Sequence, residues 1–145
     1  MEKEEDEEYQ QFIVQMRKTS VNFQQLCDIP PAELTTLFTL KKLLLKKAFV
    51  IPSDIGKALR LSRPAVSRML HNLQKKGYLT MKNREEDQRY VMVEFTEKGE
   101  ELIRKQSEKC CRVLRKVEER MGTEDMQKLL YYYSEFCTIL AEEIL

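Results

Sequence analysis

The sequence predicts a mainly α-helical protein with one small β element. Apolar residues recur at spacings of three, four and seven along most of the 145 residues, which is the period of amphipathic helices. Only residues 78–95 contain short runs rich in β-forming residues. A composition with 34% charged residues and only four Gly and four Pro also favours a helical globular protein, so we expect one domain over residues 1–145.

Two helices are expected in the first third of the chain. The first runs from about residue 9 to about residue 27, where "DIPP" breaks it. Its apolar residues at helical spacing are Phe12, Ile13, Met16, Phe23 and Leu26. Pro31 suits the first turn of the second helix, which we expect to continue through "AELTTLFTLKKLLLKKA" to Ala48.

Two shorter helices follow in close succession. Ser53 can cap or begin a helix of about two turns, and Arg60 and Leu61 form a brief link to the next helix. That helix has Ser62 as its N-cap residue and ends at Gly77. One apolar stripe marks its buried side, with Val66, Met69, Leu70 and Leu73.

The segments "YLTMK" and "RYVMVEF" predict two strands around the charged loop "NREED". Thr96 then caps a long helix, and Gly122 and Thr123 end it and cap a last one. The long helix carries a narrow apolar seam of Ile103, Cys110, Leu114, Val117 and Met121. The stripe on the last helix comprises Met126, Leu129, Leu130, Tyr133, Phe136 or Cys137, Leu140 and Ile144.

Two short helices followed by a two-stranded ribbon with a basic tip form the arrangement of a winged helix-turn-helix. The net charge is only +1, but lysines and arginines are concentrated in residues 41–89, as expected of a face that binds a polyanion. Arginine can bind guanine with two hydrogen bonds, and an arginine in the wing suits a narrow minor groove, with Asp87 bracing Arg89. The residues expected to contact DNA are Ser53, Ser62, Arg63, Pro64, Ser67, Arg68, His71, Lys75, Lys82, Arg84, Asp87 and Arg89.

These segments resemble the MarR family of transcriptional regulators. The similarity rests on "LSRPAVSRMLHNLQKKGYL" and "REEDQRYVMVEFTEKGEEL", which contain the D-x-R pattern of the wing and the T-x-K-G that restarts the helix, and it extends over nearly the whole chain. The resemblance implies a homodimer whose first, fifth and sixth helices intertwine and which presents two winged parts to successive major grooves of a pseudo-palindrome. The dimerisation helices would then span approximately residues 9–30 and 97–145, and residues 31–96 would form the winged helix-turn-helix.

The terminal helices carry more apolar surface than a small winged domain can bury, which also favours a dimer. The residues expected in its interface are Phe12, Ile13, Met16, Ile103, Cys110, Leu114, Val117, Met121, Leu130, Tyr133, Cys137, Leu140 and Ile144. The resemblance further implies a regulator, expected to be a repressor, that leaves its operator when a small aromatic ligand or an oxidant shifts the spacing of the recognition helices. Cys27 is the candidate oxidant sensor, although a buried inert thiol is the simpler reading.

Other classes are less well supported. No apolar run is long enough for a membrane span, and the acidic start "MEKEEDEEYQ" is unlike a signal peptide, so we expect a cytoplasmic protein with no membrane partner. Four cysteines without a C-x-x-C and a single histidine indicate no zinc site, disulfide framework or cofactor. Nucleophile and phosphate-loop motifs are absent, so we expect no enzyme activity, except that a thiol-dependent redox reaction at Cys27 stays open. The main alternative is a winged domain that binds an acidic protein partner without a specific operator. Separately, the lysines within residues 41–47 can equally be the solvated face of a helix that contacts no partner.

Overall fold

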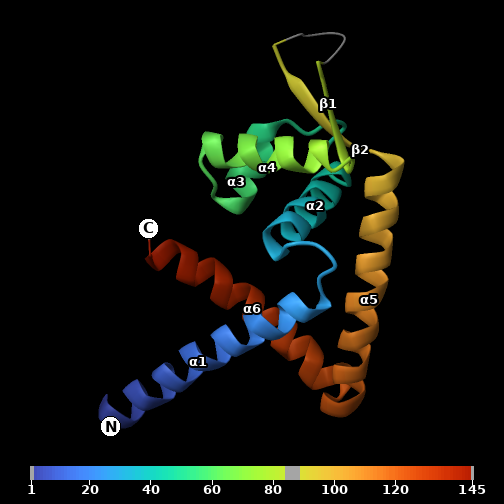
Figure 1. Cartoon of the computed structure of the whole chain (residues 1–145). Coiled ribbons are helices and arrows are strands. Elements are labelled where there is room, and N and C mark those ends of the chain that lie inside the picture. Colours follow the sequence, from blue (N-terminus) through green and yellow to red (C-terminus); the bar gives the residue numbers. More distant parts are fainter. Residues whose placement is uncertain (1, 84–88, 145) are drawn as a thin grey trace. The chain divides into compact units, whose positions relative to one another are not determined.

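The computed structural model describes residues 2–83 and 89–144, and in them it confirms the mainly helical fold with a small β wing (Figure 1). The described elements are α1 (Glu2–Leu26), α2 (Pro31–Leu44), α3 (Pro52–Leu59), α4 (Arg63–Lys75), β1 (Leu79–Asn83), β2 (Val91–Phe95), α5 (Glu97–Met121) and α6 (Thr123–Glu143). The chain divides into two compact units, residues 1–107 and 108–145, and α5 runs through the boundary between them.

The first unit contains the hydrophobic core of the winged domain. Side chains from α2, α3, α4, both strands and the start of α5 meet there with almost no exposed surface. Its buried members are Leu34, Leu37, Leu40, Val50, Ile55, Val66, Leu70, Leu73, Leu79, Val93 and Ile103. Burial of these side chains at helical and strand spacing fixes α4 against the rest of the domain and leaves its other side exposed.

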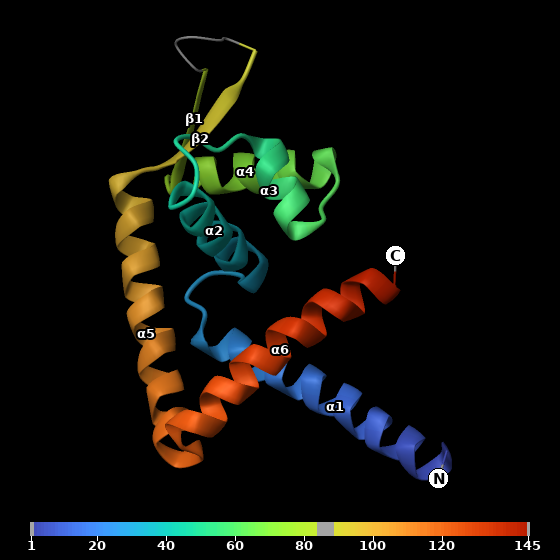
Figure 2. The same ribbon diagram turned by 180° about the vertical axis from the view of Figure 1, so that it is seen from behind.

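The two strands form an antiparallel hairpin that starts directly after α4 (Figures 1 and 2). Leu79 pairs with Phe95 and Asn83 with Val91, so that Leu79 and Val93 point into the core. The Val93 N–H also donates to the Val50 carbonyl oxygen at 2.8 Å, which ties the segment before α3 to the wing. The wing is therefore held to the helices by both packing and a backbone hydrogen bond.

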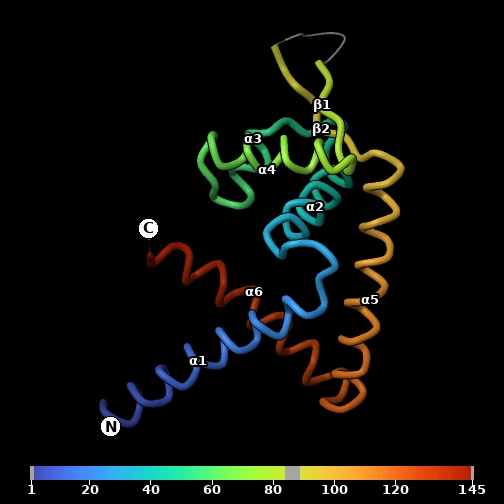
Figure 3. Tube along the Cα trace, in the orientation of Figure 1, coloured from blue at the N-terminus to red at the C-terminus, as the bar shows by residue number. Residues whose placement is uncertain are grey.

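The predicted ends of α4 are confirmed in detail. Ser62 is the N-cap residue, and its hydroxyl accepts a hydrogen bond from the Ala65 N–H. At the other end Gly77 has a φ of +86°, a conformation that glycine adopts without steric cost. The Gly77 and Tyr78 N–H groups donate to the carbonyls of Gln74 and Leu73, which is the hydrogen-bonding pattern of a Schellman motif. The short connection between α3 and α4 is easily followed in the trace (Figure 3).

Three predicted boundaries were wrong. Helix α1 begins at Glu2 and not near residue 9, because glutamate is a good helix former and the acidic first turn complements the helix dipole. Helix α2 ends at Leu44 and not at Ala48, because the chain turns so that Val50 can enter the core. The N-cap residue of α3 is Ile51, which makes Ser53 the second residue of that helix and not its cap.

The second unit contains the end of α5 and all of α6. Met126 of α6 is buried, whereas large apolar side chains on both helices are exposed. The exposed set includes Val113, Leu114, Val117, Met121, Leu129, Leu130, Tyr131, Tyr132, Tyr133, Ile139, Leu140 and Ile144. So much exposed apolar surface on two helices is typical of a surface that another protein chain covers.

Candidate nucleic-acid interface

The exposed side of α4 faces a groove of about 900 Å³ whose other walls are the start of α3 and the inner side of the wing. Residues of α4 that line this groove recur every three or four positions, so they form one stripe along the helix. The lining residues are Ile51, Pro52, Ser53, Gly56, Lys57, Leu61, Arg63, Val66, Ser67, Leu70, His71, Gln74, Met81, Asn83, Arg89, Tyr90 and Val91. Apolar side chains such as Val66 and Leu70 form the floor of the groove, and polar side chains along its walls can form hydrogen bonds with a ligand.

Five of the residues predicted to contact DNA come together in this groove. Ser53 comes from α3, three come from α4, and one comes from the wing. They are Ser53, Arg63, Ser67, His71 and Arg89. Sequence positions separated by more than thirty residues thus share one surface.

The other predicted contacts lie beside the groove or outside the described residues. Pro64, Arg68 and Lys75 are exposed on the adjoining face of α4. The Lys82 ammonium lies 3.9 Å from a Glu94 carboxylate oxygen across the hairpin, with both side chains largely exposed. Arg84 and Asp87 fall in the part of the chain that is not described, so the predicted bracing of Arg89 by Asp87 is not tested.

Sequence reasoning missed four polar groove residues, namely Lys57, Gln74, Asn83 and Tyr90. Gln74 could have been found, because it lies three positions after His71 and seven after Ser67, on the same helical stripe. The other three lie on α3 and on the hairpin, and their approach to α4 depends on tertiary packing that no local pattern indicates.

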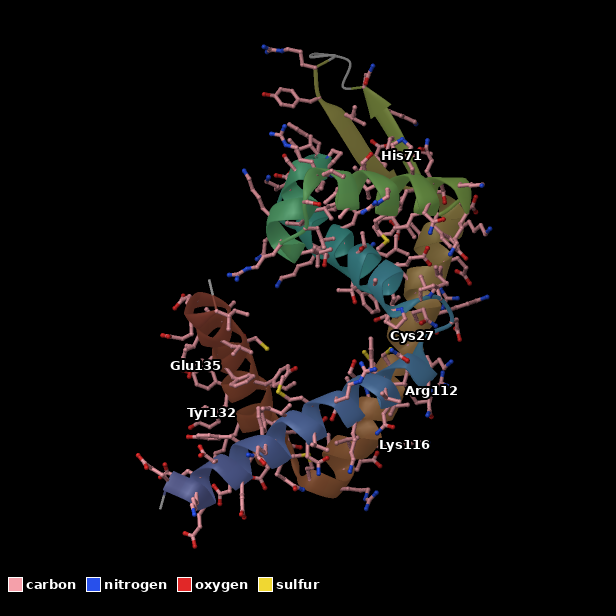
Figure 4. The ribbon with its side chains drawn as sticks, turned by 60° about the vertical axis from the view of Figure 1, so that its left-hand side comes forward. Cys27, His71, Arg112, Lys116, Tyr132 and Glu135 are labelled. Atoms are coloured by element: carbon pink, nitrogen blue, oxygen red, sulfur yellow. The ribbon has the colours of Figure 1, made fainter. Side chains whose placement is uncertain are left out.

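His71 lies on α4 on the side of the hairpin (Figure 4). Its Nδ1 atom is 2.7 Å from the carbonyl oxygen of Ser67, one helical turn earlier, and 3.4 Å from the Ser67 hydroxyl. These contacts hold the imidazole against the helix and fix which edge of the ring faces outward.

The C-terminal end of α4 is attached to α2 through a buried carboxylate. Glu33 is only 3% exposed, and both of its oxygens accept hydrogen bonds from Lys76 Nζ at 2.8 Å. Asn72 of α4 donates to the same carboxylate. A buried carboxylate needs hydrogen-bond donors for its oxygens, and here Lys76 and Asn72 supply them. These hydrogen bonds fix the position of α4 relative to α2.

The start of α5 is attached to the same end of α4. The Thr96 hydroxyl donates to the Gly77 carbonyl oxygen and accepts from the Gly99 N–H, which confirms Thr96 as a helix cap. Lys98 Nζ donates to the Lys76 carbonyl oxygen at 2.8 Å and lies 5.0 Å from the centre of the Tyr78 ring. The T-x-K-G segment thus joins α4, the hairpin and α5.

Asp54 stabilises the beginning of α3, the helix that supplies the second wall of the groove. Its carboxylate accepts from the Ile51 N–H at 3.0 Å and from Lys47 Nζ at 2.7 Å. Burial acts to raise the pKa of Asp54, but the hydrogen bonds from Lys47 and Ile51 and the nearby charges of Lys47 and Lys57 outweigh burial and lower that pKa below its usual 3.8.

Cys27 follows α1 and is partly buried, with its thiol donating to the Phe23 carbonyl oxygen at 3.3 Å. The next residue, Asp28, forms two hydrogen bonds with the fully buried side chain of Gln106 in α5. The Gln106 amide oxygen accepts from the Asp28 N–H, and its amide nitrogen donates to the Asp28 carboxylate. Cys27 therefore lies at a junction between α1, α2 and α5.

The residues predicted for a dimer interface are mostly exposed on their helices in this single chain. Phe12, Ile13, Leu114, Val117, Met121, Leu130, Tyr133, Cys137, Leu140 and Ile144 are exposed, Met16 and Cys110 are partly buried, and Ile103 is buried in the core of the winged part. Among the described residues no group of three or more His, Cys, Asp or Glu side chains could hold a metal ion. Nor do those residues include a helix with the length and hydropathy needed to cross a membrane.

Part of the chain matches a known protein family. Residues 46–99, from just after α2 to the first turn of α5, match the family described as a winged helix DNA-binding domain. Comparison with curated protein sequences finds no significant match.

Solved structures of similar fold cover most of the chain. Streptococcus pneumoniae FabT in complex with DNA has a TM-score of 0.74 at 23% identity, over 92% of this chain and 98% of that one. The S. aureus MepR–DNA complex has a TM-score of 0.61 at 19% identity, over 91% and 96% of the two chains. Wild-type apo MarR from E. coli has a TM-score of 0.65 at 20% identity, over 86% and 92%. The chain therefore shares the fold of FabT, MepR and MarR, and its residues 46–99 are similar to the winged helix DNA-binding domain family.

Proposed function

We propose that the protein is a sequence-specific transcriptional regulator that binds duplex DNA through α4 and the wing. The observation that carries the proposal is the groove in which Arg63, Ser67 and His71 of α4 face Arg89 of the wing. A helix that buries one side and exposes arginine, serine and histidine on the other fits the major groove, whose base edges these side chains can bind. The match of residues 46–99 to a winged helix DNA-binding domain supports the same reading.

The proposal includes a homodimer that binds a pseudo-palindromic operator and represses transcription. Exposed apolar side chains on α1, α5 and α6 support the dimer, because a monomer would leave them in water. The similar structures of FabT and MepR contain DNA, which supports duplex DNA as the partner. Two winged parts in a dimer would contact two half-sites one helical turn apart.

Release from DNA by a small aromatic ligand or an oxidant completes the proposed cycle. Cys27 supports the oxidant route because it lies between the end of α1 and Asp28, which is hydrogen-bonded to Gln106. Oxidation of its thiol would disturb the packing of α1, α2 and α5 at this point. If Cys27→Ser leaves DNA release by peroxide unchanged, the oxidant route fails while DNA binding stands.

Arginine substitutions test the proposal directly. Arg68→Ala and Arg89→Ala should each weaken binding of a selected duplex about 5- to 100-fold, the range expected for the loss of one base or phosphate contact. Lys116→Ala is the matched control, since Lys116 is an exposed cation on α5 outside residues 46–99 (Figure 4). Anisotropy titrations would measure all three affinities. Unchanged affinity for both arginine variants would contradict a DNA interface on α4 and the wing.

A further inference from the structure

The hydrogen bond between His71 and Ser67 determines where the imidazole carries its hydrogen. Nδ1 lies 2.7 Å from the Ser67 carbonyl oxygen, and a carbonyl oxygen can only accept. Nδ1 must therefore be the nitrogen that bears the hydrogen, whether the ring is neutral or charged. A neutral imidazole has one N–H, so its Nε2 atom is left with a lone pair and acts as an acceptor.

This acceptor is available to a ligand. His71 is exposed and lines the groove, and within the described chain no group forms a hydrogen bond with Nε2. The Ser67 carbonyl belongs to the backbone of α4, so the orientation of the ring does not depend on another flexible side chain. The outward edge of His71 thus presents a fixed acceptor on the proposed DNA-reading face.

Most of the charged groups around His71 are cations. The titratable and charged side chains that flank it on α4 or line the same groove from α3 and the wing are Lys57, Arg63, Arg68, Lys75, Arg89 and Tyr90. Lysine and arginine provide only hydrogen-bond donors, which suit phosphate oxygens and the acceptors of guanine. Neutral His71 Nε2 therefore contributes the opposite polarity and can accept a hydrogen bond from a base amino group, which the cations cannot do.

We infer that neutral His71 selects a base with an exocyclic amino group, adenine or cytosine, at one position of each half-site, and that protonation reverses this selection. The inference rests on the proposed function, because it requires α4 to lie in the major groove. There adenine presents its N6 amino group and cytosine its N4 amino group as donors, whereas guanine and thymine present acceptors. Neutral Nε2 would bond the amino bases and face a second acceptor on the keto bases.

Protonation changes the acceptor into a donor without moving the ring, because Nδ1 keeps its hydrogen bond to Ser67. The protonated imidazole would then favour guanine O6 or N7 or thymine O4. The base preference at this position should therefore differ between the two protonation states of the ring.

Selection from a pool of random-sequence duplex DNA by the full-length protein tests this inference. At about pH 8 the wild type should enrich adenine or cytosine at one position per half-site, by about 2- to 10-fold over keto bases, as one net hydrogen bond allows. At about pH 5.5 that preference should move toward guanine or thymine. His71→Ala should keep the rest of the motif and lose information at this position only, and His71→Lys, which has only donors, should prefer keto bases at both pH values.

The Lys116→Ala variant should enrich the same motif as the wild type and serves as the control for handling and selection. A motif with unchanged information in His71→Ala, or a preference for keto bases in the wild type at about pH 8, would overturn the inference alone. Failure of the wild type to enrich any sequence would overturn the proposed function and the inference together.

Discussion

Glu33 of α2 and Lys76 at the end of α4 form an ion pair in which both carboxylate oxygens accept from the same ammonium group at 2.8 Å. The Glu33 side chain is 4% exposed and the Lys76 side chain 39% exposed, so only the acidic partner of the pair is buried. Removal of the Glu33 carboxylate would leave Asn72 and Lys76 without their shared acceptor. Helix α4 would then be less firmly attached to α2.

We expect Glu33→Gln to lower the free energy of unfolding by about 1–3 kcal/mol, the cost of leaving a buried hydrogen-bonding group unsatisfied. Glu100→Gln is the matched control, because its pair with Lys41 is about half exposed on both sides and should contribute about 0–1 kcal/mol. Urea denaturation would measure both changes. Equal effects of the two substitutions would contradict the role assigned to Glu33.

Gly99 is required because α5 starts against the backbone of Tyr78. A Cβ atom at Gly99 would lie 2.1 Å from the Tyr78 carbonyl oxygen and 3.2 Å from a Phe95 ring carbon. We expect Gly99→Ala to destabilise the protein by at least about 1–3 kcal/mol and to weaken DNA binding, because the backbone must shift where α4 and the hairpin meet α5.

Gly56→Ala provides a graded comparison for Gly99. Its Cβ would lie 3.2 Å from the Val66 side chain and 3.3 Å from the Leu61 carbonyl oxygen, and alanine is favoured over glycine in a helix by about 1 kcal/mol. The loss of stability should therefore be clearly smaller at position 56 in thermal or urea unfolding. The reverse order would contradict the close approach at Gly99.

The lowered pKa of Asp54 predicts a specific pH dependence of stability. Because the pKa of its carboxyl is lower in the folded protein than the usual 3.8, the stabilisation is present above about pH 4 and is lost as the pH falls through the folded-state pKa. Asp54→Asn should therefore destabilise the protein at neutral pH by about 0.5–2 kcal/mol, the range for a lost helix cap.

As the pH falls through the folded-state pKa of Asp54, the difference between wild type and Asp54→Asn should shrink, because the Asp54 carboxyl becomes neutral, as the asparagine side chain already is. Asp125→Asn, at an exposed acid in the first turn of α6, is the control that reports general charge effects. Urea unfolding at several pH values would measure the three proteins. A difference between wild type and Asp54→Asn that stays constant with pH would show that the carboxylate charge is not what stabilises α3.

The apolar stripe of α6 predicts how the dimer can be disrupted. Leu130 is 57% exposed in the single chain, and a glutamate there would be buried without a partner in the proposed interface. We expect Leu130→Glu to weaken dimerisation at least about tenfold in sedimentation velocity, since burial of an unpaired charge costs several kcal/mol. Lys128→Glu, on the opposite side of the helix, should leave it unchanged. A Leu130→Glu protein that sediments like the wild type would exclude this face from the interface.

The ends of α4 were predictable from sequence because they depend on local chemistry. The Ser62 hydroxyl reaches a backbone N–H three residues away, and the positive φ of Gly77 is needed by the turn that follows. The end of α2 was not predictable in this way. Lysine and leucine both favour helix, and the chain leaves the helix because Val50 packs in the core and bonds Val93, more than forty residues later.

In the candidate site, too, the residues on local sequence patterns were predictable and those brought in by tertiary packing were not. Arg63, Ser67 and His71 follow from the helical period of α4, and Arg89 follows from the basic tip of the hairpin. Lys57 and Tyr90 join them only because α3 and the wing pack beside α4. The tautomer of His71 could not be predicted either, since it depends on a backbone carbonyl whose position relative to the ring is set by the side-chain rotamer.

Selection of bound fragments from random duplex DNA by the wild-type protein would show whether the protein binds DNA sequence-specifically as a dimer. We expect enrichment of an inverted repeat whose half-sites are centred about 10 base pairs, or one helical turn, apart, because two winged parts of a dimer would enter successive major grooves. Enrichment of no sequence, or of a single site without a symmetric partner, would contradict a dimeric DNA-binding regulator.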